Sequence, residues 1–191
     1  RMSEFDTIHA IATGHEGIYC SVGVHPCNVG EAEVVSVAEL VSKAQAPKVI
    51  GLGETGLDYY HDKGISKDKQ KVSFRNHIEA SRQTGLPVIV HTRDAEEDTV
   101  AILKEETAKG AFPFLIHCFT GTAWLAEQVL PLGGSISLSG ILTFKNAKEI
   151  QAVARDLPLE KILVETDAPY LAPMPYRGKR KIGRASCRER V

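Results

Sequence analysis

The sequence of 191 residues contains only four cysteines, and none of them forms a C-x-x-C pair. A chain of this length with so little cysteine argues against a disulfide framework, so a reducing cytoplasm is the expected location. No apolar run approaches the roughly 20 residues that a membrane-spanning helix needs. No secretory segment opens the sequence either, and we therefore expect no membrane association.

An excess of charge of either sign is also lacking. The chain has 23 basic and 24 acidic residues and a formal net charge of −1, so no global field attracts nucleic acid and any binding of a polyanion must be local. Hydrophobic residues make up 43% of the sequence, which is ordinary for one globular domain. The composition gives no prediction of the oligomeric state.

Six short apolar runs alternate with longer stretches that have helical spacing. Runs such as Val88-Ile89-Val90 are nearly continuous, which predicts a parallel sheet covered by helices. This alternation fits either an open doubly wound sheet or a closed barrel, and periodicity does not separate the two. The predicted strands are residues 19–24, 48–53, 87–91, 113–117, 134–139 and 162–165, and the predicted helices are 3–17, 67–84, 94–109, 122–132 and 145–156.

Ionisable side chains follow five of the predicted strands. In a parallel barrel the carboxyl ends of all strands open onto one face, so these side chains are expected to converge. A single histidine at a strand end is more often structural, but repetition over five strands favours metal binding, because polar groups buried without partners are costly. Imidazole and carboxylate ligands suit Zn²⁺, Mn²⁺ and similar ions. The five residues are His25, Glu54, His91, His117 and Asp167.

Longer motifs surround the same positions. The segments at residues 22–26, 51–59, 87–91, 117–121, 165–171 and 177–180 read V-G-V-H-P, G-L-G-E-T-G-L-D-Y, P-V-I-V-H, H-C-F-T-G, E-T-D-A-P-Y-L and R-G-K-R. In content and order they resemble the motifs of the TatD family of metal-dependent deoxyribonucleases. The resemblance covers residues 2 to about 181.

This resemblance implies an α/β fold, a TIM-type (β/α)₈ barrel of which the chain carries an incomplete part. The six predicted strands would be the third to the eighth, with the first two strands and the last helix missing. The H-x-H ligand pair of the family's first strand occurs nowhere in the sequence. Residues 1–181 would form the partial barrel, while residues 182–191 resemble a translated sequencing adapter and are interpreted as a non-native read-through tail.

The resemblance also implies residue roles. Glu54 would bridge two divalent ions (Mg²⁺, Mn²⁺ or Zn²⁺), His91 and His117 would hold the second ion, and Asp167 would complete the first. Glu54 and Asp167 would thus be catalytic, with Asp167 orienting the attacking water or accepting its proton. His25 would contact substrate or a neighbouring group, or anchor its loop at the following proline.

Two further features concern substrate binding. Arg177 and Arg180 lie in the one local basic cluster and could contact phosphate oxygens, although a basic run is as often a solvated loop. Cys27 stands where the family commonly has a second histidine, as in V-H-P-H, and this departure weakens a substrate role for the loop.

The implied function is a metal-dependent hydrolase that cleaves phosphodiester bonds of DNA, mainly single strands from the 3′ end, using metal-activated water. The alternatives are an amidohydrolase or lactonase on the same two-metal barrel, since a barrel and its metals do not decide the substrate. A catalytically dead fragment is a third interpretation, because the H-x-H ligands are absent. The 191-residue chain itself is expected to be inactive or poorly folded, because open sheet edges invite aggregation.

Overall fold

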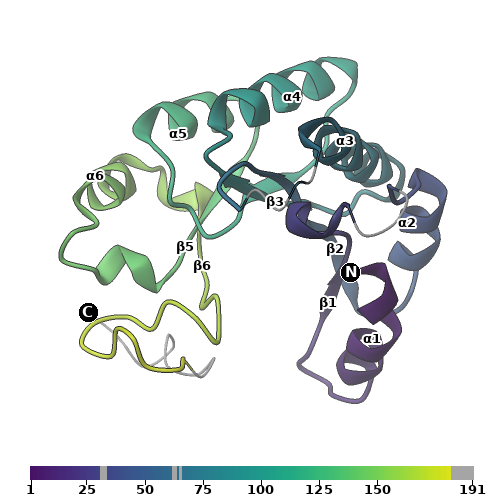
Figure 1. Ribbon diagram of the computed structural model, residues 1–191, viewed down its shortest axis with the longest axis horizontal. Helices are drawn as coiled ribbons and strands as arrows, with labels where there is room; N and C mark the ends of the chain where they lie inside the picture. Colours follow the sequence, from purple (N-terminus) through teal and green to yellow (C-terminus); the bar gives the residue numbers. More distant parts are fainter. Residues whose placement is uncertain (31–33, 62–63, 65, 182–191) are drawn as a thin grey trace. The chain divides into compact units, whose positions relative to one another are not determined.

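The computed structural model describes residues 1–30, 34–61, 64 and 66–181. Strands and helices alternate along the chain, and the strand order in the sheet is the chain order, β1-β2-β3-β4-β5-β6 (Figure 1). The predicted α/β alternation is therefore confirmed. Two compact units are present, Arg1–Leu115 and Ile116–Val191, with the boundary inside β4. The predicted tail at residues 182–191 lies outside the described residues.

The first unit packs helices against parallel strands. β1 pairs with β2 and β2 with β3, all in parallel, and Val22, Leu40, Leu52 and Ala80 belong to its buried apolar core. Helix α3 lies alongside α2 and α4 (Figure 1). In chain order the elements are η1 (Met2–Glu4), α1 (Phe5–Thr13), β1 (Cys20–Val22), η2 (Pro26–Asn28), α2 (Val37–Ala44), β2 (Val49–Asp58), α3 (Lys67–Thr84), β3 (Val88–Arg93), α4 (Glu96–Lys109) and β4 (Phe114–Ile116).

The second unit has a shorter parallel ladder. β5 pairs with β6, and the Glu165 N–H donates to Leu138 O at 3.0 Å just beyond the last paired residues. Helices α5 and α6 contact each other. The elements after β4 are α5 (Ala123–Val129), β5 (Ser135–Leu138), η3 (Gly140–Thr143), α6 (Lys148–Asp156), η4 (Leu159–Lys161) and β6 (Ile162–Val164).

Helix α3 has the predicted bounds, and local chemistry explains both ends. The Ser66 hydroxyl accepts a hydrogen bond from the Lys69 N–H at 3.4 Å, as an N-cap does. Gly85 ends the helix in the left-handed region with φ 74°, and its N–H donates to Ser81 O at 2.8 Å. The apolar side chains of Phe74 and Ile78, one helical turn apart, are fully buried.

Other predicted helix bounds were wrong. Strand β3 runs to Arg93 and the backbone turns sharply at Asp94 (φ 51°), so α4 begins at Glu96 with Ala95, not Asp94, at its N-cap. Helix α2 was not predicted, although Ser36 caps it by accepting from the Glu39 N–H, the first half of a capping box. The predicted helices at 3–17, 122–132 and 145–156 are shorter in the structure.

Strand β2 is longer than predicted and places Glu54 inside the strand instead of after it. The pairing with β3 shifts register between Gly53 and Thr55 and then continues, with Gly56 opposite His91. A Cβ at Gly56 would lie 2.1 Å from His91 O, and the residue has φ 126°. Only glycine tolerates both conditions. The glycine at position 56 therefore allows the pairing of β2 with β3 to continue after the register shift, and Glu54 then lies beside β3.

Candidate metal centre

Three predicted site residues from separate segments meet in the first unit. Glu54 comes from β2, His91 from β3 and His25 from the turn after β1. The Nδ1 atom of His91 is 2.9 Å from Glu54 Oε1, and His25 Nε2 is 3.8 Å from the same oxygen. One ligand atom of each residue lies within 4.8 Å of the others. Glu54 Oε1 and His91 Nδ1 are oxygen and nitrogen donors of the kind that suits a divalent ion.

A buried histidine outside the cluster holds two of these segments. His77 on α3 accepts a hydrogen bond at Nε2 from the Val24 N–H (3.2 Å), and its Nδ1 faces Ser73 O at 2.7 Å and Thr55 Oγ1 at 3.2 Å. Val24 precedes His25, and Thr55 follows Glu54. Complete burial lowers the pKa of His77 to about 4, so the ring is neutral and donates only from Nδ1.

Asp58, at the end of β2, contacts the cluster, although it was not among the predicted site residues. Its Oδ2 is 3.0 Å from His91 Nε2 and 2.8 Å from His61 Nδ1, and its side chain is wholly buried. Burial alone would raise the pKa of Asp58, but hydrogen bonds from His61 and His91 hold it well below the ordinary range. An ionised Asp58 therefore orients the His91 ring. The signal in the sequence is the spacing of Glu54 and Asp58, which places both on one face of a strand.

The protonation of His25 favours a donor over a metal ligand. Its Nδ1 accepts a hydrogen bond from the Cys27 N–H at 3.2 Å, so the proton of the neutral ring is on Nε2. Burial, which outweighs the attraction of Glu54, lowers the pKa of His25 to about 4. The Nε2–H group points to the same region as Glu54 and is able to donate to an anionic oxygen, consistent with the predicted contact to substrate.

The other two predicted ligands lie together in the second unit. His117 directly follows β4, and its Nδ1 is 2.5 Å from Glu165 Oε2 while its Nε2 is 3.7 Å from Asp167 Oδ1. Glu165 thus supports His117 as Asp58 supports His91. A carboxylate on the far nitrogen of a metal-ligating histidine fixes ring orientation and raises basicity. Glu165 had no predicted role, although it opens the E-T-D motif.

The predicted phosphate-binding arginines are both exposed. The guanidinium of Arg177 lies 4.5 Å from the centroid of the Phe144 ring, which keeps the cation on the surface of the second unit. Arg180 follows in the same irregular segment.

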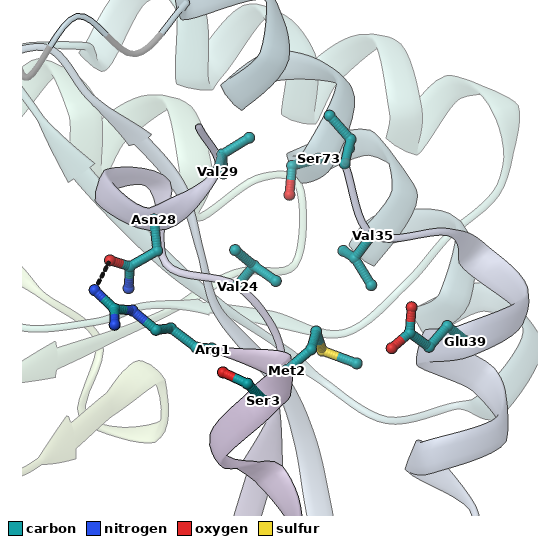
Figure 2. Close-up of a pocket in the computed structure, with 10 residues that line it drawn as sticks. Arg1, Met2, Ser3, Val24, Asn28, Val29, Val35, Glu39 and Ser73 are labelled. Atoms are coloured by element: carbon teal, nitrogen blue, oxygen red, sulfur yellow. Dashed lines mark hydrogen bonds between the residues drawn. The ribbon is translucent and has the colours of Figure 1, made fainter. Parts of the chain in front are cut away.

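One cavity of about 340 Å³ lies in the first unit. Val24, Val35 and Ser73 line it, and at its rim Arg1 Nη2 donates to Asn28 Oδ1 at 3.5 Å (Figure 2). None of its lining residues is a predicted ligand. The chemistry of the cluster, and not this cavity, therefore defines the candidate site.

Two expectations from composition concern membrane-spanning helices and disulfide bonds. Within the described ranges, no helix combines the length and apolar character needed to cross a bilayer. Cys20, Cys27 and Cys118 form no disulfide in that part of the chain.

Comparison with known proteins gives a consistent family assignment. The family described as TatD related DNase matches residues 1–190. The uncharacterized metal-dependent hydrolase YcfH of Escherichia coli is 48% identical over 86% of this chain and 60% of its own length. The uncharacterized metal-dependent hydrolase YabD of Bacillus subtilis is 42% identical over 87% of this chain and 64% of its own. The chain therefore spans less than two thirds of the length of these relatives.

A third relative has a named activity, and a solved structure shares the fold. The 3′-5′ ssDNA/RNA exonuclease TatD of Erwinia billingiae is 34% identical over 91% of this chain and 67% of its own length. The crystal structure of YJJV, a TatD homolog from E. coli, superposes with a TM-score of 0.86 over 97% of this chain and 72% of that chain, at 26% identity. The incomplete α/β barrel predicted from the sequence is consistent with this likeness and with the six strands observed.

Proposed function

The chain belongs to the TatD-related DNase family. From this premise we propose that it is part of a metal-dependent hydrolase that cleaves phosphodiester bonds of DNA. The enzyme removes nucleotides from the 3′ end of single strands in the cytoplasm. The observation that carries the proposal is the pairing of Glu54 Oε1 with His91 Nδ1 at 2.9 Å, with His25 beside them. Similarity to a relative named as a 3′-5′ exonuclease supports the choice of substrate.

The donor set supports binding of two divalent ions by Glu54, His91, His117 and Asp167. Each histidine has one nitrogen close to a buried or half-buried carboxylate, Asp58 for His91 and Glu165 for His117. Such pairing is what a metal-ligating imidazole needs, and nitrogen and oxygen donors suit Mg²⁺, Mn²⁺ or Zn²⁺. When bound, the ions supply Lewis-acid activation of water and neutralise charge on the phosphate.

The protein side chains perform the remaining tasks. Asp167 accepts the proton of the attacking water, and its Oδ1 lies 3.7 Å from His117 Nε2. His25 donates from Nε2 to a non-bridging phosphate oxygen beside Glu54. Arg177 and Arg180 bind phosphates further along the strand by charge-assisted hydrogen bonds. The chain's net charge of −1 makes these local contacts necessary.

The test measures release of mononucleotides from single-stranded DNA by the full-length gene product that carries this chain. We expect activity only with a divalent ion, and a loss on the order of 10²–10⁴-fold in kcat for Asp167→Asn, because a positioned acid–base group contributes that much. Glu54→Gln is expected to lose both activity and bound metal. Asp156→Asn and Glu127→Gln, exposed carboxylates on α6 and α5, serve as matched controls.

Different outcomes test the roles proposed for the residues and the substrate proposed for the enzyme. Activity that persists in Glu54→Gln or Asp167→Asn contradicts the roles proposed for these two carboxylates. Metal-dependent turnover of N-acyl or lactone substrates with none on DNA would replace the nuclease by an amidohydrolase or lactonase on the same ligands.

A further inference from the structure

A second group of metal-binding side chains lies next to the proposed hydrolytic centre. We propose that Cys27, Asp58 and His61 form a separate site for Zn²⁺ or another thiophilic divalent ion. The three come from the turn η2, the end of β2 and the residues just after it, and one ligand atom of each lies within 4.8 Å of the others. The inference does not depend on the proposed hydrolase activity.

The observed distances are close to those of a tetrahedral site. With Zn–O near 2.0 Å and Zn–S near 2.3 Å, tetrahedral angles place the oxygen and sulfur about 3.5 Å apart. Cys27 Sγ and Asp58 Oδ2 are 3.5 Å apart. His61 Nδ1 is 2.8 Å from the same oxygen, so an entering ion requires this pair to separate by about 0.5 Å to reach the corresponding nitrogen–oxygen edge.

Asp58 is held in place by contacts that do not use the oxygen facing the site. Its Oδ1 accepts from the Tyr60 and His61 N–H groups at 3.1 and 2.8 Å. The Gln70 side chain accepts from the Asp58 N–H at 2.8 Å and donates to its carbonyl at 3.1 Å. The carboxylate is therefore preorganised, with Oδ2 facing Cys27, His61 and His91.

Access and donor type select the kind of ion. The His61 side chain is 44% exposed, so an ion reaches the site from solvent and a water can complete its coordination. Binding releases the Cys27 thiol proton to solvent, and ligation through Nδ1 places the remaining proton of His61 on the outer Nε2. A thiolate selects Zn²⁺ or Co²⁺ over Mg²⁺ and Mn²⁺, whereas the Glu54–His91 group has only nitrogen and oxygen donors.

Sharing of Asp58 connects this site to its neighbour. Asp58 Oδ2 also faces His91 Nε2 at 3.0 Å, and a carboxylate oxygen has lone pairs for both a hydrogen bond and an ion. An ion at Cys27–Asp58–His61 would therefore join η2 to the end of β2 while leaving the support of His91 in place.

The experiment is a Co²⁺ titration of the metal-free protein under a non-thiol reductant, followed by near-ultraviolet absorption, in which a thiolate–Co²⁺ bond gives a charge-transfer band. We expect the band to saturate with Co²⁺, to resist excess Mg²⁺ and to disappear on addition of Zn²⁺. Cys27→Ser should abolish the band, and His61→Gln should weaken Co²⁺ binding by at least about 100-fold, above the 10–100-fold typical of groups that only support a ligand.

Controls identify the sulfur and separate this site from the hydrolytic one. Cys118→Ser, which removes a thiol of the second unit, should keep the band, and so should Glu54→Gln, which removes a ligand of the neighbouring group. A band that survives Cys27→Ser overturns the proposal. Absence of a band in the unaltered protein at saturating Co²⁺ also overturns it and leaves Cys27, Asp58 and His61 as a hydrogen-bonded cluster only.

Discussion

Single buried polar residues hold the segments of the candidate site at fixed positions. His77 accepts from Val24 N–H and contacts Thr55, so one imidazole sets the positions of the residues beside His25 and Glu54. The same neutral ring also makes stability depend on pH, because the unfolded chain is free to protonate it.

We predict a loss of stability on acidification that depends on His77. The pKa of His77 is lowered from 6.5 to about 4 in the folded protein, so the unfolded state takes up the proton first as the pH falls. Its contribution is complete above pH 6.5 and lost by about pH 4, at most about 3 kcal/mol. Denaturant unfolding at several pH values, in the presence of a chelator, measures the slope of the free energy of unfolding against pH.

Matched variants separate the contribution of His77 to this slope from that of His25. The pKa of His25 is also lowered to about 4, so both histidines act over the same pH range. His77→Gln should reduce the slope of unfolding free energy against pH by one proton. His15→Gln, at an exposed position after α1, is the control variant. An unchanged slope in His77→Gln would show that the ring does not remain neutral in the folded state.

At the scale of elements, α3 and α4 are joined by a cluster of ion pairs around Glu106. Glu106 is buried on α4 and pairs with Arg75 Nη1 at 2.5 Å, with Lys109 Nζ at 2.9 Å, and with Arg82. Burial alone would raise the pKa of Glu106, but hydrogen bonds from Lys109, Arg82 and Arg75 lower it to about 2. The helix that carries His77 is therefore fixed to its neighbour by charge as well as by apolar contact.

We predict that Glu106→Gln lowers the free energy of unfolding by about 2 kcal/mol, because it removes the buried carboxylate that Arg75 and Arg82 share and leaves them only the more exposed Glu105 and Glu79 as partners. Glu105→Gln removes a neighbouring carboxylate that also pairs with Arg75 and Lys109 but is half exposed. Solvent screening makes its loss much smaller. Equal effects of the two variants in chemical denaturation would contradict a special role for the buried carboxylate.

For the whole molecule, the candidate ligands are divided between the two compact units. Glu54 and His91 belong to Arg1–Leu115, and His117 and Asp167 to Ile116–Val191. The proposed function assigns ion ligands to each of the two units. Metal binding should then stabilise the folded chain, since a ligand at 100 times its Kd adds about 2.7 kcal/mol.

We predict that saturating Mn²⁺ raises the unfolding temperature above that in chelator by roughly 5–10 °C for a chain of this size. His91→Ala and His117→Ala should each lose part of this rise. Thermal unfolding and the measured metal content report the effect, with His15→Gln as control. A full rise in either variant would contradict the ligand role proposed for that histidine.

Local patterns in the sequence determined the alternation of strands and helices, the bounds of α3 and the family. Apolar runs such as Val88-Ile89-Val90, the cap at Ser66 and the glycine at residue 85 act on neighbouring residues, so they are readable without tertiary structure. The proposed ligands were likewise recognised from motifs. The strand register that brings Glu54 beside His91 depends on Gly56, because the backbone at this residue lies very close to His91 O. This contact exists only once β2 and β3 are paired, so the sequence alone does not show it.

Only the tertiary structure showed which residues contact the proposed ligands. Asp58 meets Cys27 across 31 positions and His91 across 33, Glu165 meets His117, and Glu106 is buried because arginines of α3 come to its helix. The physical reason is that a buried carboxylate is stable only where distant donors converge on it, and that convergence follows from strand register and helix packing. Hydrophobic periodicity describes one element at a time and carries no information about such partners.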